Sequence, residues 1–298
     1  MNTNTWRMVV TQSDSAAYNM AVDEAIFNAC RRGAARPTLR LYTWRPPAVS
    51  LGYGQTLETE LDPRRCRAYG IDIVRRPSGG RAVLHDEELT YALILPEGFG
   101  DTGRSAYEVY RWMSDLLIGA LRDMGVPAEL AVNLEVSEPD ENAAQVDGDT
   151  DEDALSSNER EGACFTQTTR YEIEVHGRKL VGSAQRRANG YLLQHGSLLL
   201  GPGHKRLPLL LPHALHGRRE RMAQELDRHT VSLSELMGKR VRFEDMVPRI
   251  MRAFSTSQKI PHRLVDLTAS ERAEATRLVE DKYGHSDWNN RRITAYGQ

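Results

Sequence analysis

The chain has 298 residues, of which 40% are hydrophobic and 27% charged, proportions that support a buried core and a soluble surface. Its formal net charge of -2 gives no global basic field of the kind that favours nucleic-acid binding. No run approaches the ~18 apolar residues of a membrane span, and the first residues lack the pattern of a secretory signal, so we expect a cytoplasmic protein.

Alternating strands and helices are predicted for the first half of the chain. Apolar residues between Ser15 and Arg32 recur with a helical period, and Ser13 or Asp14 is expected to cap that helix. Asp62 followed by Pro63 indicates the start of a short helix. The expected strands lie at 7–11, 39–44, 48–53, 71–75, 81–84 and 89–95, and the expected helices at 15–32, 62–69 and 106–124.

An acidic stretch interrupts this pattern. Residues 133–162 contain eleven acidic residues, one basic residue and no aromatic residue. Such a composition buries too little apolar surface to offset the entropy of ordering the backbone. We therefore expect a flexible acidic insertion at about 134–161, in the class of long loops that are either functional or disordered.

Three strands and two helices are expected after the insertion. The His176-Gly177 and Ala188-Asn189-Gly190 segments are typical of turns between antiparallel strands. The fold class is accordingly α+β, with mixed, largely antiparallel sheets packed with helices. We expect residues 1–255 to form a catalytic domain and 256–298 a C-terminal helical extension packed on it. The expected strands lie at 170–175, 178–184 and 191–200, and the helices at 243–254 and 270–283.

The Arg75–His85 segment contains two adjacent glycines, Gly79 and Gly80, between arginines. Glycine pairs let a backbone approach a ligand closely, and successive free N–H groups form a cradle for an anion or an acyl carbonyl. The flanking arginines, Arg75, Arg76 and Arg81, could hold a phosphate or a carboxylate. The ordinary alternative is a tight turn with solvated arginines, and the pattern matches neither a P-loop nor a dinucleotide fingerprint.

The Gly177–Gln185 segment is the second candidate. Strand alternation is expected to place Lys179 on the same face as Val181 and Ser183. A lysine in a dry pocket loses its charge readily and can act as an acid or a base, or orient a carbonyl. The alternative is a surface lysine after a turn.

The cysteines are Cys30, Cys66 and Cys164, an odd and sparse set that argues against a disulfide framework. The sequence has no CxxC and no HExxH, so no metal site is expected. Cys164 follows the acidic insertion, and a thiolate near lysine or arginine is an effective nucleophile toward thioesters. Cys30 and Cys66 are interpreted as small buried apolar residues. His85 and His195 are further candidates.

Taken together, these segments resemble the biotin/lipoate A/B protein ligase and transferase family, and most closely its cysteine-dependent octanoyltransferases. The resemblance extends over most of the chain. The matching stretches are Asn19–Ala25, Tyr42-x-Trp44-x-Pro46, Ser50–Gln55, Arg75–His85, Glu88–Tyr91, Cys164-Phe165, Gly177–Gln185, Leu193–Ser197 and Lys282-Tyr283-x5-Trp288-Asn289.

The resemblance implies a catalytic pair, Cys164 and Lys179. An octanoyl group would pass from acyl carrier protein to Cys164 and then to a lysine of a lipoyl domain, such as the glycine-cleavage H protein. No cofactor, metal, nucleic acid or membrane is implied for this transfer. The residues expected to bind the substrate are Arg75, Ser78, Gly79, Gly80, Arg81, His85, Gly182, Ser183, Ala184 and His195.

Three other readings are open. An ATP-dependent lipoate–protein ligase would use the same fold and lysine, with ATP and magnesium and without a nucleophilic cysteine. An amidotransferase would keep Cys164 but take the acyl group from another lipoyl domain. A non-catalytic module would bind carrier or lipoyl domains without turnover.

Overall fold

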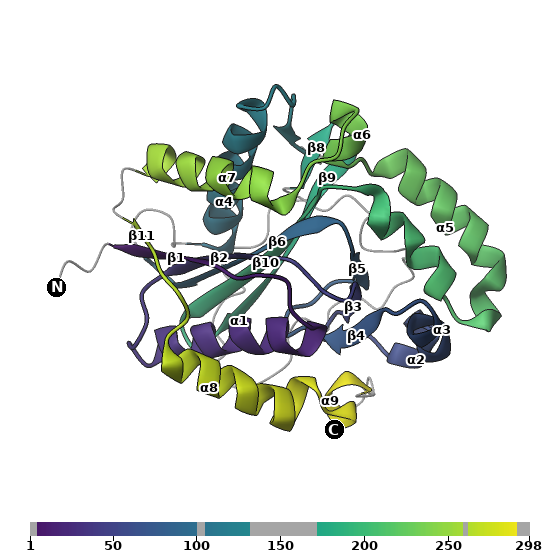
Figure 1. Cartoon of the computed structure of the whole chain (residues 1–298), viewed down its shortest axis with the longest axis horizontal. Helices are drawn as coiled ribbons and strands as arrows, with labels where there is room; N and C mark the ends of the chain where they lie inside the picture. The colour runs from purple at the N-terminus through teal and green to yellow at the C-terminus, as the bar shows by residue number, and fades with distance from the viewer. Residues whose placement is uncertain (1–4, 100–104, 132–171, 259–261, 291–298) are drawn as a thin grey trace.

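The computed structural model describes residues 5–99, 105–131, 172–258 and 262–290, and it arranges them around an eight-stranded sheet between two helical layers (Figure 1). Across the sheet, the strands follow the order β11 (His262–Leu264), β1 (Trp6–Val10), β2 (Thr38–Tyr42), β6 (Glu88–Pro96), β10 (Tyr191–Leu199), β9 (Arg178–Ala188), β8 (Ile173–Val175) and β7 (Glu129–Leu130).

The centre and one side of this sheet are antiparallel, from β2 through β6, β10, β9 and β8 to β7. The β9–β10 hairpin turns at Asn189 and Gly190, which both have positive φ, as the Asn-Gly pair predicts. At the other side, β1 pairs in parallel with both β2 and β11. The predicted α+β class is confirmed, and the parallel pairs qualify its largely antiparallel character.

Helices cover both faces of the sheet. Helices α4 (Ala106–Arg122) and α7 (Phe243–Gln258) cover one face, and α1 (Ala16–Arg31) and α8 (Ala269–Leu278) cover the other (Figure 1). On the α4–α7 face, the Trp6 ring stacks on Trp112 at 5.5 Å and meets the edge of Phe254 at 5.5 Å. Aromatic pairs of this geometry stabilise a core beyond the area that they bury.

A smaller sheet, in the order β4 (Asp72–Arg75), β3 (Ala48–Leu51) and β5 (Val83–His85), stands beside the large one. Its connection from β4 to β5 is the glycine loop, residues 76–82. Asp62 accepts hydrogen bonds from two backbone N–H groups and caps α3 (Pro63–Ala68), as predicted. The remaining helices are α2 (Leu57–Glu60), η1 (Pro202–Leu210), η2 (His213–Leu215), α5 (His216–His229), α6 (Leu233–Met237), η3 (Val279–Tyr283) and α9 (Ser286–Asn289).

Several expectations about elements are wrong. The cap of α1 is Ser15 rather than Ser13 or Asp14, because the Ser15 side chain accepts the backbone N–H of Tyr18. The segment from η1 to α6 is helical, although no helix is expected there. Helix α7 runs across the expected domain boundary at residue 255, and β11 adds a strand to the large sheet. The part of the chain after residue 255 is therefore more than a helical extension.

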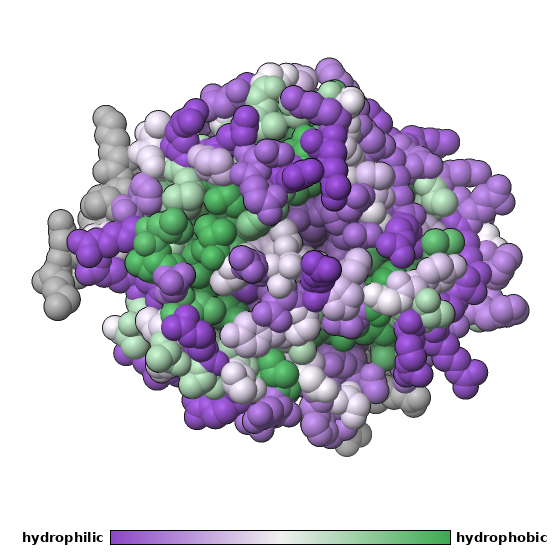
Figure 2. All heavy atoms as spheres, viewed as in Figure 1, coloured by the Kyte–Doolittle hydropathy of each residue, from purple (hydrophilic) through white to green (hydrophobic). Residues whose placement is uncertain are grey.

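The acidic insertion at about 134–161 and Cys164 lie outside the described residues. Within the described parts of the chain, we find no helix of the length and apolar character that a membrane span demands. The face shown in Figure 2 is mostly hydrophilic, and its largest apolar patch lies on the side where Figure 1 places β1, β11 and α7.

Candidate active site

Five of the residues predicted for the site gather where β9, β10 and the small sheet meet. A narrow cavity of about 40 Å³, which we call the sheet pocket, lies between them. Its walls combine aromatic rings and small residues with buried hydroxyl and imidazole groups, as expected for a pocket that holds an apolar group with a polar end. Five predicted site residues line it: His85, Gly182, Ser183, Ala184 and His195.

His85 is held on three sides. Its ring stacks on Trp44 at 4.1 Å between centroids. Its Nδ1 lies 2.8 Å from Glu88 Oε1, and its Nε2 lies 2.7 Å from Ser50 Oγ. Because a carboxylate only accepts hydrogen bonds, Nδ1 is the donor to Glu88, and in the neutral ring Nε2 then accepts from the Ser50 hydroxyl. The imidazole is therefore fixed in both orientation and tautomer.

Arg76 shapes the glycine loop. From the sequence, we expect this residue to face a ligand. Its Nη2 donates to the carbonyl oxygens of Gly79 at 2.6 Å and Arg81 at 2.8 Å, and its Nη1 donates to the carbonyl of Ser50 at 2.9 Å. Gly80 has a φ of +90°, a left-handed conformation that glycine adopts without steric cost. Arg76 lines the sheet pocket as well, so it joins the loop to the pocket wall.

Gly52, at the end of β3, lets the glycine loop lie close. A Cβ at Gly52 would fall 1.8 Å from the carbonyl oxygen of Gly80, which no side chain tolerates. The backbone N–H of Tyr53 also donates to the carbonyl of Ser78 at 3.0 Å. The sequence singles out Gly52 only as part of a matching stretch, because the contact joins segments nearly thirty residues apart.

Arg75 lies outside the sheet pocket. Its guanidinium donates to the carbonyl oxygens of Gly52 and Tyr53 and to those of Trp288 and Asn289 in α9. Its backbone is bound by the same C-terminal residues, since Trp288 Nε1 donates to the Arg75 carbonyl at 2.9 Å. These contacts join the C-terminal segment to the glycine loop, so Arg75 supports the loop on the side of α9. Its expected contact with the substrate stays a prediction.

Ser78, Gly79, Gly80 and Arg81 form the loop itself and do not line the sheet pocket. The Ser78 hydroxyl is buried and has no hydrogen-bond partner among the described residues. Such a group is unfavourable unless something binds it. The substrate contact expected of Ser78 stays a prediction, since its buried hydroxyl lies outside the sheet pocket.

His195 lies on β10 beside a buried ion pair between Asp23 and Arg40. The sequence predicts no role for this pair. Arg40 Nη1 lies 2.6 Å from Asp23 Oδ1, the Tyr42 hydroxyl donates to Asp23 Oδ2 at 2.8 Å, and His195 Nε2 lies 3.2 Å from the same oxygen. Burial alone raises the pKa of Asp23, but Arg40 and His195 together hold that pKa below its ordinary value. Asp23 could have been noticed as a carboxylate within the apolar face of a helix.

Lys179 is buried at the start of β9, with 2% of its surface exposed, and it forms an ion pair with Glu172. The pairing with β8 advances from Glu174–Lys179 to Ile173–Val181, so Leu180 is the extra residue of a bulge. Leu180 and Val181 both enter the same core cluster. The expected sharing of one face by Lys179 and Val181 is therefore wrong, because the bulge breaks the alternation.

This bulge turns Lys179 toward the face of Gly182, which lines the sheet pocket, although Lys179 itself does not line it. Ser183 lines the pocket, and its hydroxyl is 2.6 Å from the Tyr91 hydroxyl. Burial raises the pKa of Tyr91 to about 12, so Tyr91 stays protonated and can donate.

Of the three cysteines, Cys30 and Cys66 are buried, as predicted. Burial raises the pKa of Cys30 to about 12 and that of Cys66 to about 11, so neither forms a reactive thiolate near neutral pH. In the described ranges, no three histidine, cysteine, aspartate or glutamate side chains gather as metal ligands would.

The comparisons with known proteins agree with this architecture. A Kyrpidia tusciae protein named octanoyltransferase LipM is 40% identical over 97% of this chain and 99% of its own, and the Bacillus subtilis protein of the same name is 33% identical over 98% and 100%. A Thermoplasma acidophilum bipartite lipoate protein ligase has a similar fold, with a TM-score of 0.73, 21% identity and 98% of each chain covered. The family model of the lipoyl protein ligase A/B catalytic domain matches residues 15–255, and the chain belongs to this family.

Proposed function

We propose that this protein is an octanoyltransferase of lipoate assembly. The observation that carries the proposal is the similarity, over nearly the whole chain, to proteins named octanoyltransferase LipM. The lining of the sheet pocket supports it, because its apolar side chains suit an acyl chain, while His85 and Ser183 offer polar groups for the thioester end. An octanoyl chain is larger than this cavity of about 40 Å³, so the pocket must widen to receive it.

For the donor, we propose an acyl carrier protein that presents the octanoyl group as a thioester. The thiolate of Cys164 attacks the octanoyl carbonyl, the new C–S bond forms on the enzyme, and the carrier thiol leaves with a proton. Cys30 and Cys66 are unsuited to this step because burial keeps their thiols protonated. A free thiol in this role also fits a reducing, cytoplasmic location.

For the acceptor, we propose a lysine of a lipoyl domain, such as that of the glycine-cleavage H protein. Its amine attacks the octanoyl carbonyl, an amide forms, and the thiol of Cys164 is released. Lys179 would orient the carbonyl or move protons, and its buried ion pair with Glu172 fixes its side chain for such a task. A thioester already carries the energy for amide formation, so the transfer needs neither ATP nor a metal.

The test is a two-stage assay with the full chain. The enzyme is mixed with octanoyl carrier protein, and intact-mass and peptide mass spectrometry measure any adduct. An octanoyl group on Cys164, followed by its transfer to a lipoyl domain without ATP, is the expected result. Cys164→Ser should abolish both stages, whereas Cys66→Ser should abolish neither.

Three other outcomes would replace this proposal. Octanoyl or lipoyl transfer that needs ATP and magnesium, with no adduct on Cys164, would make the protein a lipoate–protein ligase. An adduct that forms only from an octanoylated lipoyl domain would make it an amidotransferase. Binding of both proteins without any turnover would leave a non-catalytic module.

A further inference from the structure

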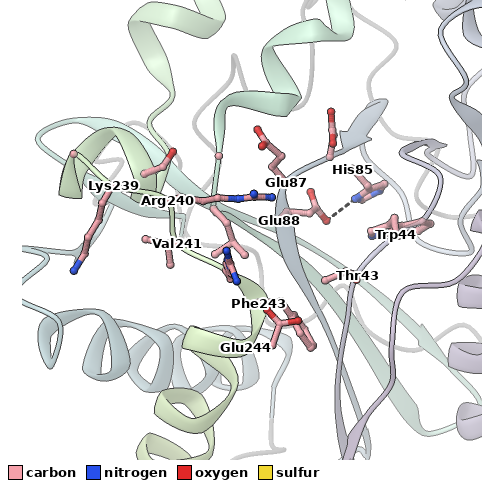
Figure 3. A pocket seen from close by; sticks show the side chains of 16 residues that line it. Thr43, Trp44, His85, Glu87, Glu88, Lys239, Arg240, Val241, Phe243 and Glu244 are labelled. Atoms are coloured by element: carbon pink, nitrogen blue, oxygen red, sulfur yellow. Dashed lines mark hydrogen bonds and ion pairs between the residues drawn. The ribbon is translucent and has the colours of Figure 1, made fainter.

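A second and larger recess borders the sheet pocket. This outer cleft, of about 560 Å³, lies between the β5–β6 turn and the connection from α6 to α7 (Figure 3). Trp44 and His85 line both recesses, so the stacked pair forms their common wall. A group bound in the outer cleft is therefore beside whatever occupies the sheet pocket.

The two sides of the outer cleft carry opposite charge. Carboxyl groups from the β5–β6 turn and the start of β6 form one side, and cationic side chains from the α6–α7 connection form the other. Figure 3 shows Arg240 reaching across the cleft toward Glu87 and Glu88. The acidic residues on the β5–β6 side are Asp86, Glu87 and Glu88, and the opposite side carries the basic residues Lys239, Arg240 and Arg242 together with Glu244 at the start of α7.

The basic residues are available to a partner. Lys239, Arg240 and Arg242 are all exposed, and none of their side chains forms an ion pair with another residue in the described ranges. On the opposite side, Asp86 is already paired with Arg206 at 2.9 Å. The cleft thus presents an exposed cationic rim.

Glu88 gives a second and independent sign of a ligand. It is 4% exposed, and its Oε1 accepts hydrogen bonds from His85, Thr90 and Ser197. Its Oε2 is buried and has no hydrogen-bond partner among the described residues. A buried carboxylate oxygen without a donor is unfavourable, and a cation or a hydrogen-bond donor bound in the cleft would remove that penalty.

We propose that the outer cleft receives the acceptor lysine, and that Glu88 Oε2 binds the ε-ammonium group of this lysine. The inference rests on the proposed function and names the path by which the acceptor reaches the acyl group. A long side chain ending in a cation fits the carboxyl side of the cleft. Acidic residues around that lysine on the partner domain would contact the cationic rim, so a lysine flanked by aspartate or glutamate matches both sides.

The experiment separates the two half-reactions. Wild-type enzyme, Arg240→Glu and Lys239→Glu are first charged with octanoyl carrier protein, and acyl-enzyme formation is followed by intact mass. Transfer to a lipoyl domain is then measured over a range of acceptor concentrations. We expect the rim variants to form acyl-enzyme at the wild-type rate and to raise the acceptor KM roughly five- to thirtyfold, because each reversal replaces an attraction by a repulsion.

Arg252→Glu is the matched control, since Arg252 is exposed on α7 and does not line the cleft. It should leave the acceptor KM unchanged. An acceptor domain in which one acidic residue beside the lysine is changed to lysine should recover affinity for Arg240→Glu. Equal acceptor KM for Arg240→Glu and Arg252→Glu would overturn the inference, as would a rise in the donor KM instead.

Glu88→Gln tests the ammonium contact. This variant should slow transfer to the lipoyl lysine at least tenfold more than it slows transfer to hydroxylamine, a small uncharged nucleophile. Equal losses with both acceptors would show that Glu88 only supports His85. Failure of the wild-type enzyme to acylate any lipoyl domain would instead refute the proposed function, so the two failures are distinguishable.

Discussion

Replacing Gly52 by alanine is a direct test of the close contact between β3 and the glycine loop. The new Cβ would fall 1.8 Å from the carbonyl oxygen of Gly80, whereas real contacts of this kind begin near 3.0 Å. The loop must therefore retreat by more than about 1 Å, against the hydrogen bonds that Arg76 makes to it. Overpacking of this kind destabilises a protein by about 1–3 kcal/mol.

For a chain of 298 residues, that loss lowers Tm by roughly 2–5 °C. The effect on turnover should be larger, because a displacement of about 1 Å in a substrate-positioning element costs on the order of a hundredfold in rate. Thermal unfolding and octanoyl transfer, measured on the same preparation, test both expectations.

Gly54→Ala is the matched control, since a Cβ at Gly54 meets no atom within 4 Å. Both variants carry the same chemical change two residues apart, so a difference between them reports the contact with Gly80 alone. If Gly52→Ala matched Gly54→Ala in Tm and in rate, the glycine loop would not depend on this contact.

Three further predictions concern buried groups. Burial and Lys205 lower the pKa of His204 from 6.5 to about 4. The free energy of unfolding should therefore be unaffected by this residue above pH 6.5 and fall by about 3 kcal/mol as the pH drops to 4, because the unfolded chain binds the proton more tightly. Urea unfolding at several pH values should show this fall, and His204→Gln should make the free energy of unfolding less dependent on pH. Asp23→Asn leaves the buried Arg40 without its carboxylate partner and should lower the free energy of unfolding in urea by about 3–5 kcal/mol. A decrease of less than about 1 kcal/mol would contradict a tight ion pair. Iodoacetamide at pH 8 should leave Cys30 unmodified in the folded protein, by peptide mapping, because burial raises the pKa of its thiol to about 12.

The strands and helices with strong local signals were predictable from the sequence. Asp62 before Pro63 marks a helix start, and Asn189-Gly190 marks a hairpin, because each depends on a few neighbouring residues. The helices between β10 and α7 escaped prediction. Pro202 opens the first of them and Pro208 lies inside it, so proline there interrupts the periodicity that identifies a helix.

The site was predictable in its residue types but only partly in its geometry. His85, Ser183 and His195 stand in conspicuous segments, and the structure brings them together around one pocket. The role of Arg76 as a support for the glycine loop depends on carbonyl groups, which every residue has, so the sequence carries no sign of it. The bulge at Leu180 is equally hidden, since it arises from pairing with β8.

The wall formed by Trp44 and His85 explains how one site can serve two dissimilar groups. The sheet pocket on one side has small and aromatic residues, whereas the outer cleft on the other has charged residues. Glu88 lines the outer cleft and not the sheet pocket, but one of its carboxyl oxygens fixes the His85 ring that both share, and the other lies without a partner beside the cleft. On the proposed function, the acyl chain would lie in the sheet pocket and the ammonium group would enter through the outer cleft, and both would contact His85, which lines the two recesses.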